Sequence, residues 1–314
     1  MKKKAIIISI KGSKLTIKEE LLLSHERPWG LILFKRNIKS LNQIKFLIQN
    51  IRKLTKDKYF PVLIDEEGST VTRLKKIINH DITANYFGKF YSLNNKSSIN
   101  IYKEYLTSLC KVLRNIGINI NTVPVLDVLR KNTNKVISSR SFSNNKEIVK
   151  KLGTITVNQC HANKIISVLK HIPGHGCATS DSHFTMPKVN LSSCDLNKID
   201  FYPFKFNPAK LAMTAHILYK KIDNKNVATF SEKIIKNTIR KKIGFKGILI
   251  SDDISMKALN YDLVTNAKKS LSAGCNLVLY CAGNINDNFK LIKSVPYIDK
   301  FTTKKTTEIY KILG

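Results

Sequence analysis

The sequence predicts one (β/α)8 barrel domain spanning residues 1–314, and three observations support this fold class. Eight apolar runs of strand length alternate with segments of helical periodicity. The runs are continuous rather than alternating, which is typical of parallel strands covered on both faces. Polar side chains follow many different strands, and a ring of strand ends around one pocket explains them: Asp65, Asp127, Lys170, His171, His216, Asp252 and Asp253. A doubly wound open sheet is the alternative.

The expected strands are short apolar segments that end where polar or turn residues begin. In chain order they are 5–10, 31–34, 62–64, 118–125, 165–169, 211–214, 247–250 and 277–279.

The expected helices carry recognisable ends. Thr16 and Glu19 have the spacing of a capping box, and Ser231 has the place of an N-cap. Gly117, Gly244 and Gly274 mark C-terminal ends. The segment 191–208 contains two prolines and is expected to be irregular. The helical segments are 41–54, 101–116, 145–162, 231–243, 258–273 and 303–313, after a first one at 17–23.

The composition is strongly basic, with 54 Lys and Arg against 22 Asp and Glu and a formal net charge of +32. These basic residues are spread along the whole chain, without a nucleic-acid-binding motif, so we expect no specific nucleic-acid partner. A polyanion-binding protein with a vestigial site is the non-enzymatic alternative. The six cysteines include no C-x-x-C pair, and Cys110 and Cys160 fall on apolar helical patterns as core thiols.

The N-terminus begins with three lysines and an apolar run, as a signal peptide does. The run ends at Lys11 without a small-residue cleavage site, so we interpret it as the first strand. No apolar run approaches the length of a membrane span. We therefore expect a cytoplasmic protein without a membrane partner, and a monomer.

One loop, 170–183, holds three of the seven histidines. Asp181 lies two positions before His183, and a carboxylate can accept a hydrogen bond from one imidazole nitrogen. The other nitrogen is then available as a proton donor or acceptor. Two alternatives stay open, a loop-stabilising hydrogen bond and a metal site that would also use His171 and His175.

A second candidate site is the pair Asp252-Asp253 at the end of a buried strand. Side chains alternate along a strand, so only one of the two carboxylates can face the barrel mouth. That carboxylate could be a nucleophile or a metal ligand. Alternatively, Asp253 or Ser255 caps the next helix.

A third candidate is Asp65, which ends a strand and is followed by a Gly-containing turn and Arg73. Buried carboxylates in such positions commonly accept pairs of sugar hydroxyls, and an arginine can orient them. A structural ion pair is the alternative. Arg140 adds a further cationic side chain.

Taken together, these motifs resemble the β-N-acetylhexosaminidases of glycoside hydrolase family 3, the cytoplasmic single-barrel enzymes of bacterial peptidoglycan recycling. The segment Lys170-His171-Ile172-Pro173-Gly174-His175-Gly176 with Asp181-Ser182-His183 is the most specific match. The resemblance covers nearly the whole chain, in order, through 30–37, 65–68, 123–128, 140–142, 170–183, 213–216 and 244–256.

The resemblance implies a role for each matching residue. Asp252 matches the catalytic nucleophile, His183 the general acid/base and Asp181 its orienting partner. The positions that match those holding a terminal N-acetylglucosamine are Asp65, Arg73, Arg140, Lys170 and His171.

The implied activity is that of a retaining exo-β-N-acetylglucosaminidase acting on small glycans or muropeptide fragments, with no cofactor and no metal. A β-N-acetylglucosaminide phosphorylase is the close alternative, and a metal-dependent hydrolase on the same barrel is a more distant one.

The chain departs from the family pattern at a few positions. Ser69-Thr70 replace a second Gly and an Arg, which is expected to alter the loop between Asp65 and Arg73. Further departures are Glu66 for Gln, Ser139 for an acidic residue and Asn276 for Asp. The matches to the catalytic groups are intact.

Overall fold

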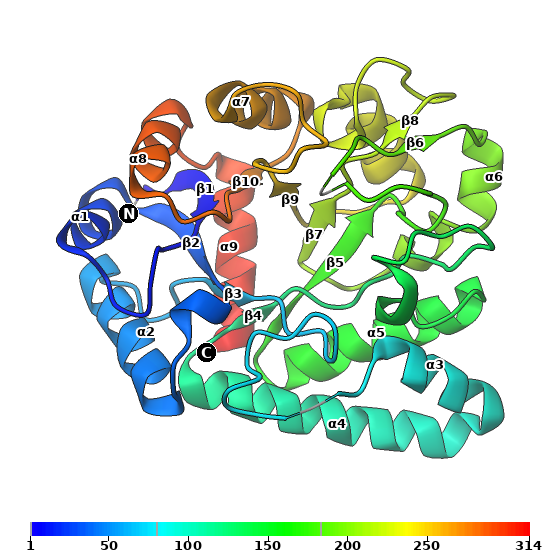
Figure 1. Cartoon of the computed structure of the whole chain (residues 1–314), viewed down its shortest axis with the longest axis horizontal. Helices are drawn as coiled ribbons and strands as arrows, with labels where there is room; N and C mark the ends of the chain where they lie inside the picture. Colours follow the sequence, from blue (N-terminus) through cyan, green and yellow to red (C-terminus); the bar gives the residue numbers. More distant parts are fainter. Residues whose placement is uncertain (1, 80, 183) are drawn as a thin grey trace.

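The computed structural model describes residues 2–79, 81–182 and 184–314, and it confirms the (β/α)8 barrel. The strands close in the order β1-β10-β9-β7-β5-β4-β3-β2, and every neighbouring pair is parallel (Figure 1). Their bounds are β1 (Lys4–Ile8), β2 (Pro28–Leu33), β3 (Val62–Ile64), β4 (Ile120–Asn121), β5 (Ile166–Ile172), β7 (Leu211–Thr214), β9 (Ile248–Asp253) and β10 (Leu277–Leu279).

Helices surround the barrel, and β6 (Lys188–Val189) and β8 (Leu218–Tyr219) form a small separate sheet. The helices are α1 (Ile17–Leu21), α2 (Leu41–Thr55), α3 (Ala84–Leu93), α4 (Asn95–Ile116), α5 (Lys146–Ala162), α6 (Ser193–Lys198), α7 (Leu263–Ala273), α8 (Ile285–Ser294) and α9 (Lys300–Leu313). Shorter or π-helical segments are η1 (Leu22–Glu26), η2 (Lys35–Asn37), η3 (Ser138–Arg140), η4 (Tyr202–Phe204), η5 (Ala228–Phe230) and η6 (Ile234–Lys242).

The helix ends follow from local sequence chemistry. The capping box at Thr16 and Glu19 is present, and the Ser231 hydroxyl accepts the N–H of Ile234 at 3.1 Å. Gly117 and Gly274 end α4 and α7 with φ of 93° and 113°, a conformation that glycine adopts without steric cost. The predicted signals at these ends are therefore confirmed.

The fourth strand is much shorter than the predicted segment 118–125. β4 comprises only Ile120 and Asn121, and the chain then reaches Pro124, which has no N–H to donate to a sheet. Side chains also replace ladder contacts, because the Asn119 and Asn121 amide oxygens accept the N–H groups of Val62 and Glu66. Apolar content alone does not report this side-chain competition.

Several other predicted boundaries were wrong. β5 extends to Ile172, so Lys170 and His171 lie within the strand, and β9 includes both Asp252 and Asp253. The segment 191–208 contains α6 and η4, and neither α3 nor α8 was predicted. α7 begins at Leu263 with Asp262 as its N-cap, so neither Asp253 nor Ser255 caps it.

The barrel interior is apolar, and α9 packs against its amino-terminal end. Ile7, Leu63 and Val168 belong to a fully buried cluster that also includes Ile309 of α9. The Trp29 indole N–H, at the start of β2, donates to the Thr306 hydroxyl of α9 at 2.8 Å. In Figure 1, α9 is seen across the barrel. The polar side chains that line the large cavity lie at the opposite, carboxyl end of the strands.

Two further sequence features have clear places in the fold. Cys110 and Cys160 are buried free thiols that form no disulfide, and their Sγ atoms lie 3.8 Å apart in a hydrogen bond. This confirms them as core thiols. The Asn276 amide oxygen accepts hydrogen bonds from Arg240 and the Leu249 N–H, both at 2.8 Å, so a neutral side chain serves where the family has Asp. Among the described helices, none has the length and apolarity needed to cross a membrane.

Candidate active site

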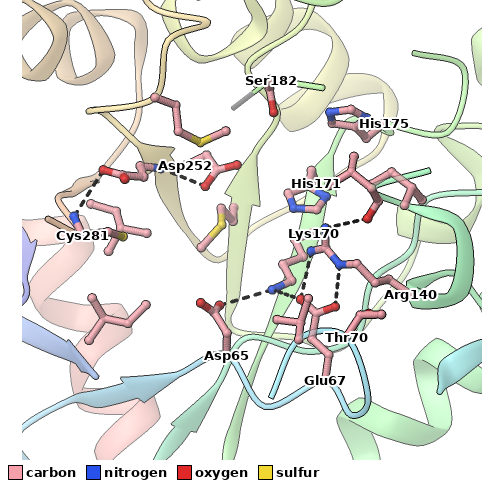
Figure 2. A pocket seen from close by; sticks show the side chains of 18 of the residues that line it. Asp65, Glu67, Thr70, Arg140, Lys170, His171, His175, Ser182, Asp252 and Cys281 are labelled. Atoms are coloured by element: carbon pink, nitrogen blue, oxygen red, sulfur yellow. Dashed lines mark hydrogen bonds and ion pairs between the residues drawn. The ribbon is translucent and has the colours of Figure 1, made fainter. Parts of the chain in front are cut away.

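A cavity of about 440 Å³ opens at the carboxyl ends of the barrel strands. Figure 2 shows Asp65, Glu67, Arg140 and Lys170 grouped together, with Asp252 on another part of the wall. Six of the eight predicted site residues line this cavity: Asp65, Arg73, Arg140, Lys170, His171 and Asp252.

The other two predicted residues belong to the histidine loop. Asp181 is half-buried, and its carbonyl accepts the N–H groups of Phe184 and Thr185. Ser182, the next residue, is buried and lines the cavity. His183 lies outside the described residues, so its role stays a prediction.

Asp65, at the end of β3, forms the centre of a charged group. One carboxylate oxygen lies 2.9 Å from Arg73 Nη2, and the other lies 3.4 Å from Lys170 Nζ and accepts the Thr122 hydroxyl. Burial alone would raise the pKa of Asp65, but Lys170 and Arg73 lower it well below its usual value. Asp65 is therefore an ionised acceptor with its orientation fixed by two cations.

Glu67 is a cavity residue that the sequence analysis missed. Its carboxylate receives Arg140 Nε at 2.7 Å and Nη2 at 2.9 Å, and Lys170 Nζ lies 2.6 Å away. Burial acts to raise the pKa of Glu67, but Arg140 and Lys170 lower it to about 2. Glu67 thus neutralises the two cations and holds their side chains in the cavity wall.

The loop between Asp65 and Arg73 is held by Glu66, one of the departures from the family. The buried Glu66 carboxylate accepts the Thr72 hydroxyl and the N–H groups of Arg73 at 2.7 Å and Leu74 at 2.9 Å. Ser69 has a φ of 45°, in the left-handed region that glycine adopts more readily. The Asp65–Arg73 pair forms despite the Ser69-Thr70 change, and Thr70 lines the cavity.

Asp127 is buried and holds the beginning of the histidine loop through hydrogen bonds. It accepts the His171 Nδ1 at 2.7 Å and the backbone N–H of His175 at 2.6 Å. Burial would raise the pKa of Asp127, but the imidazole and N–H groups of His171 and His175 lower it. With Nδ1 turned toward Asp127, His171 has only Nε2 left for a ligand. The sequence placed Asp127 at a strand end but assigned it no role.

Asp252 and Asp253 have different surroundings although both line the cavity. Asp253 accepts the N–H groups of Ser255 and Cys281, and burial raises its pKa. Among the described residues, the Asp252 carboxylate accepts a hydrogen bond from the adjacent Asp253 N–H, at 2.8 Å. Burial opposes its ionisation, but His216, His171, that N–H and Lys170 together lower the pKa of Asp252. Asp252 is thus the ionised carboxylate with lone pairs available to a ligand.

His216 is buried and hydrogen-bonds to the end of β9. Its Nε2 lies 3.0 Å from the Asp253 carbonyl, which can only accept, so the proton is on Nε2. Nδ1 contacts the Thr229 hydroxyl at 2.7 Å, and burial lowers the pKa of His216. His216 therefore acts as a hydrogen-bonding support for the strand that carries Asp252.

The arrangement can bind a polyhydroxylated ligand against fixed charges while an ionised carboxylate faces it. Buried carboxylates and cations of this kind hydrogen-bond sugar hydroxyls and reject ligands that lack them. Within the described residues, no three His, Cys, Asp or Glu side chains converge as a possible metal site.

Removal of the Glu67 charge should destabilise the protein in a pH-dependent way. Glu67→Gln leaves Arg140 and Lys170 without their shared counter-charge, which should cost about 3–5 kcal/mol of unfolding free energy at pH 7. Because the folded-state pKa is lowered, the Glu67 contribution is complete above its ordinary pKa of 4.5 and is lost as the pH falls toward about 2.

The free energies of unfolding of the wild type and of Glu67→Gln should therefore become more similar as the pH falls. Urea unfolding at pH 7 and pH 3 measures this, with the exposed Glu104→Gln on α4 as the matched control. Equal stability of Glu67→Gln and the wild type at pH 7 would contradict the role of Glu67.

Comparison with known proteins gives consistent matches. The model of the glycosyl hydrolase family 3 N-terminal domain matches residues 3–305. A beta-hexosaminidase from Actinobacillus succinogenes is 32% identical over 305 residues, which cover 94% of this chain and 87% of that protein. The crystal structure of NagZ from Neisseria gonorrhoeae in complex with N-trifluoroacetyl-D-glucosamine aligns with a TM-score of 0.88 at 28% identity, covering 98% of this chain and 90% of that one.

A longer protein shares the same fold. The glycoside hydrolase family 3 beta-N-acetylglucosaminidase from Paenibacillus sp. str. FPU-7 aligns with a TM-score of 0.86 at 23% identity. The match covers 98% of this chain but 60% of that one.

Proposed function

Because the chain belongs to glycosyl hydrolase family 3, we propose that it is a retaining exo-β-N-acetylglucosaminidase that releases terminal β-linked N-acetylglucosamine. The observation that carries this proposal is the ionised Asp252 carboxylate, which faces a cavity whose wall holds fixed carboxylates and cations. The relatives named as beta-hexosaminidases support the same reaction.

In the first step, an Asp252 oxygen attacks the anomeric carbon as the glycosidic C–O bond breaks. His183 donates a proton to the departing oxygen, and the sugar becomes an ester of Asp252. In the second step, His183 removes a proton from water, which attacks the anomeric carbon and releases Asp252. Two inversions at one carbon give net retention. The Asp181–His183 pair thus takes the place of the second carboxyl group.

The other cavity residues hold the terminal sugar. Asp65 accepts sugar hydroxyls while Arg73 and Lys170 fix its orientation. Arg140 and Nε2 of His171 supply further donors or acceptors at the same wall. A substrate without matching hydroxyls would leave these buried charges unpaired, which accounts for selectivity toward the terminal residue.

The substrates that fit the family are muropeptide fragments, and the proposed setting is cytoplasmic peptidoglycan recycling by a monomer. The exposed mouth of the cavity suits a leaving group of variable size.

A product assay tests the proposal. The protein is incubated with N,N′-diacetylchitobiose and with a chromogenic N-acetyl-β-glucosaminide, beside the corresponding glucoside, and the first-formed anomer is identified by NMR. We expect release of β-N-acetylglucosamine from both substrates and little turnover of the glucoside. An α-anomer as the first product would exclude retention.

The same assay separates the alternatives. A sugar 1-phosphate formed in phosphate buffer would identify a phosphorylase, and loss of activity after exhaustive chelation would identify a metal-dependent hydrolase. Salt-sensitive binding of a nucleic acid duplex without any hydrolysis would favour the polyanion-binding alternative.

A further inference from the structure

Residues 133–137 form a short loop that is hydrogen-bonded to residues 176–179 of the histidine loop, 170–183. The Thr133 hydroxyl donates to the Gly176 carbonyl at 2.6 Å. The Asn134 backbone N–H donates to the Ala178 carbonyl at 3.1 Å, and its side-chain Nδ2 donates to the Thr179 carbonyl at 3.1 Å. Three successive contacts therefore hold the segment 176–179 from one side.

The same loop contacts the sugar-binding wall. The Asn134 side-chain oxygen accepts the Val136 N–H at 2.9 Å, and the Val136 carbonyl accepts Arg140 Nη1 at 3.2 Å. Arg140 in turn forms the two-pronged pair with Glu67. A continuous chain of hydrogen bonds thus runs from Glu67 through Arg140 and Asn134 to the histidine loop.

The two ends of the segment 176–182 are fixed independently of Asn134. A Cβ added at Gly176 would lie 1.8 Å from the Val128 carbonyl oxygen. The Gly176 backbone therefore packs closely against Val128, in the segment that follows β4. At the other end, the Ser182 carbonyl accepts the Ala258 N–H at 3.2 Å. Asn134 contacts Ala178 and Thr179 between these anchors, three and two residues before Asp181.

From this geometry we propose that Asn134 is a positioning residue, which sets the loop carrying Asp181 and His183 relative to the bound sugar. The inference rests on the proposed function, in which His183 protonates the leaving oxygen. Displacement of the loop by a fraction of an ångström would misdirect that proton without removing Asp252 or the sugar contacts. Proton delivery matters most for a leaving group whose conjugate acid has a high pKa.

Asn134→Ala should therefore affect substrates unequally. For N,N′-diacetylchitobiose, whose leaving alkoxide needs protonation, we expect kcat/KM to fall about 10- to 100-fold. For 2,4-dinitrophenyl N-acetyl-β-glucosaminide, whose leaving group departs unprotonated, the fall should be less than about 3-fold. The ratio kcat/KM is the proper measure because it reports the first, bond-breaking step.

Thr133→Val removes the neighbouring contact with Gly176. Like Asn134→Ala, it should lower kcat/KM more for the disaccharide than for the dinitrophenyl substrate. It keeps the test decisive if Asn134→Ala does not fold. Asn132→Ala, an identical change at the exposed position directly before this loop, is the matched control and should leave both values unchanged.

A double variant separates positioning from general loosening. In a His183→Ala background no proton donor remains to be positioned, so Asn134→Ala should change kcat/KM for the disaccharide less than about 2-fold. Equal falls for both substrates, or full additivity in the double variant, would overturn the inference. If the wild type hydrolyses neither substrate, the proposed function fails instead.

Discussion

Replacement of Asp252 by alanine should reduce kcat/KM for N-acetylglucosaminides by on the order of 10⁴-fold or more, because it removes the group that forms the covalent bond in the proposed mechanism. The fold should persist, since Asp252 lies at a strand end and its carboxylate, within the described residues, accepts a hydrogen bond from the N–H of its neighbour Asp253. Asp252→Asn keeps the side-chain shape and should be nearly as inactive, because an amide is a far weaker nucleophile than a carboxylate.

A small anion offers a direct check of the role of Asp252. With Asp252→Ala and the dinitrophenyl substrate, added azide should restore turnover and yield the α-glycosyl azide, because azide attacks from the face that the carboxylate vacated. Asp81→Ala, at an exposed position, is the control and should behave as the wild type. Near-normal activity of Asp252→Ala without azide would show that another residue is the nucleophile.

Replacement of His183 by alanine should produce the second-largest loss, and its size should depend on the leaving group. For the disaccharide we expect kcat/KM to fall about 10²- to 10⁴-fold, the range that general acid catalysis contributes. For the dinitrophenyl substrate the fall should be less than about 10-fold, because that leaving group needs no proton. A series of aryl N-acetylglucosaminides with leaving groups of increasing pKa measures the dependence.

The exposed His25→Ala on η1 is the matched histidine control. If the loss at His183 is the same for every leaving group, the acid/base assignment is wrong and another proton donor must be sought. His171 would be the first candidate, since it presents Nε2 to the cavity and is oriented by Asp127.

The barrel and most of the cavity wall were predictable because parallel strands leave a simple signature. Each buried strand is a continuous apolar run, and each carboxyl end places polar side chains at one mouth. Asp65, Lys170 and Asp252 follow this rule, and all three line the cavity. That these side chains meet at one mouth follows from the parallel order of the strands, which the alternation of strands and helices predicts.

Other features depend on contacts that no local pattern reports. Glu66 and Glu67 are adjacent and chemically alike, but Glu66 accepts loop N–H groups whereas Glu67 pairs with Arg140 and Lys170. Arg140 is more than seventy residues away in sequence, so only the closed barrel reveals the partner. The short β4 likewise results from side-chain contacts with neighbouring strands.

The position of α9 has a consequence for the order of events in catalysis. Because α9 and the apolar barrel interior close the amino end, the described part of the chain offers the sugar a route only through the mouth at the carboxyl end. In the proposed mechanism, the first product leaves through this passage before water reaches the glycosyl ester, and the released sugar then departs by the same passage. Product release should therefore be ordered, with free N-acetylglucosamine competing directly with the next substrate molecule for entry.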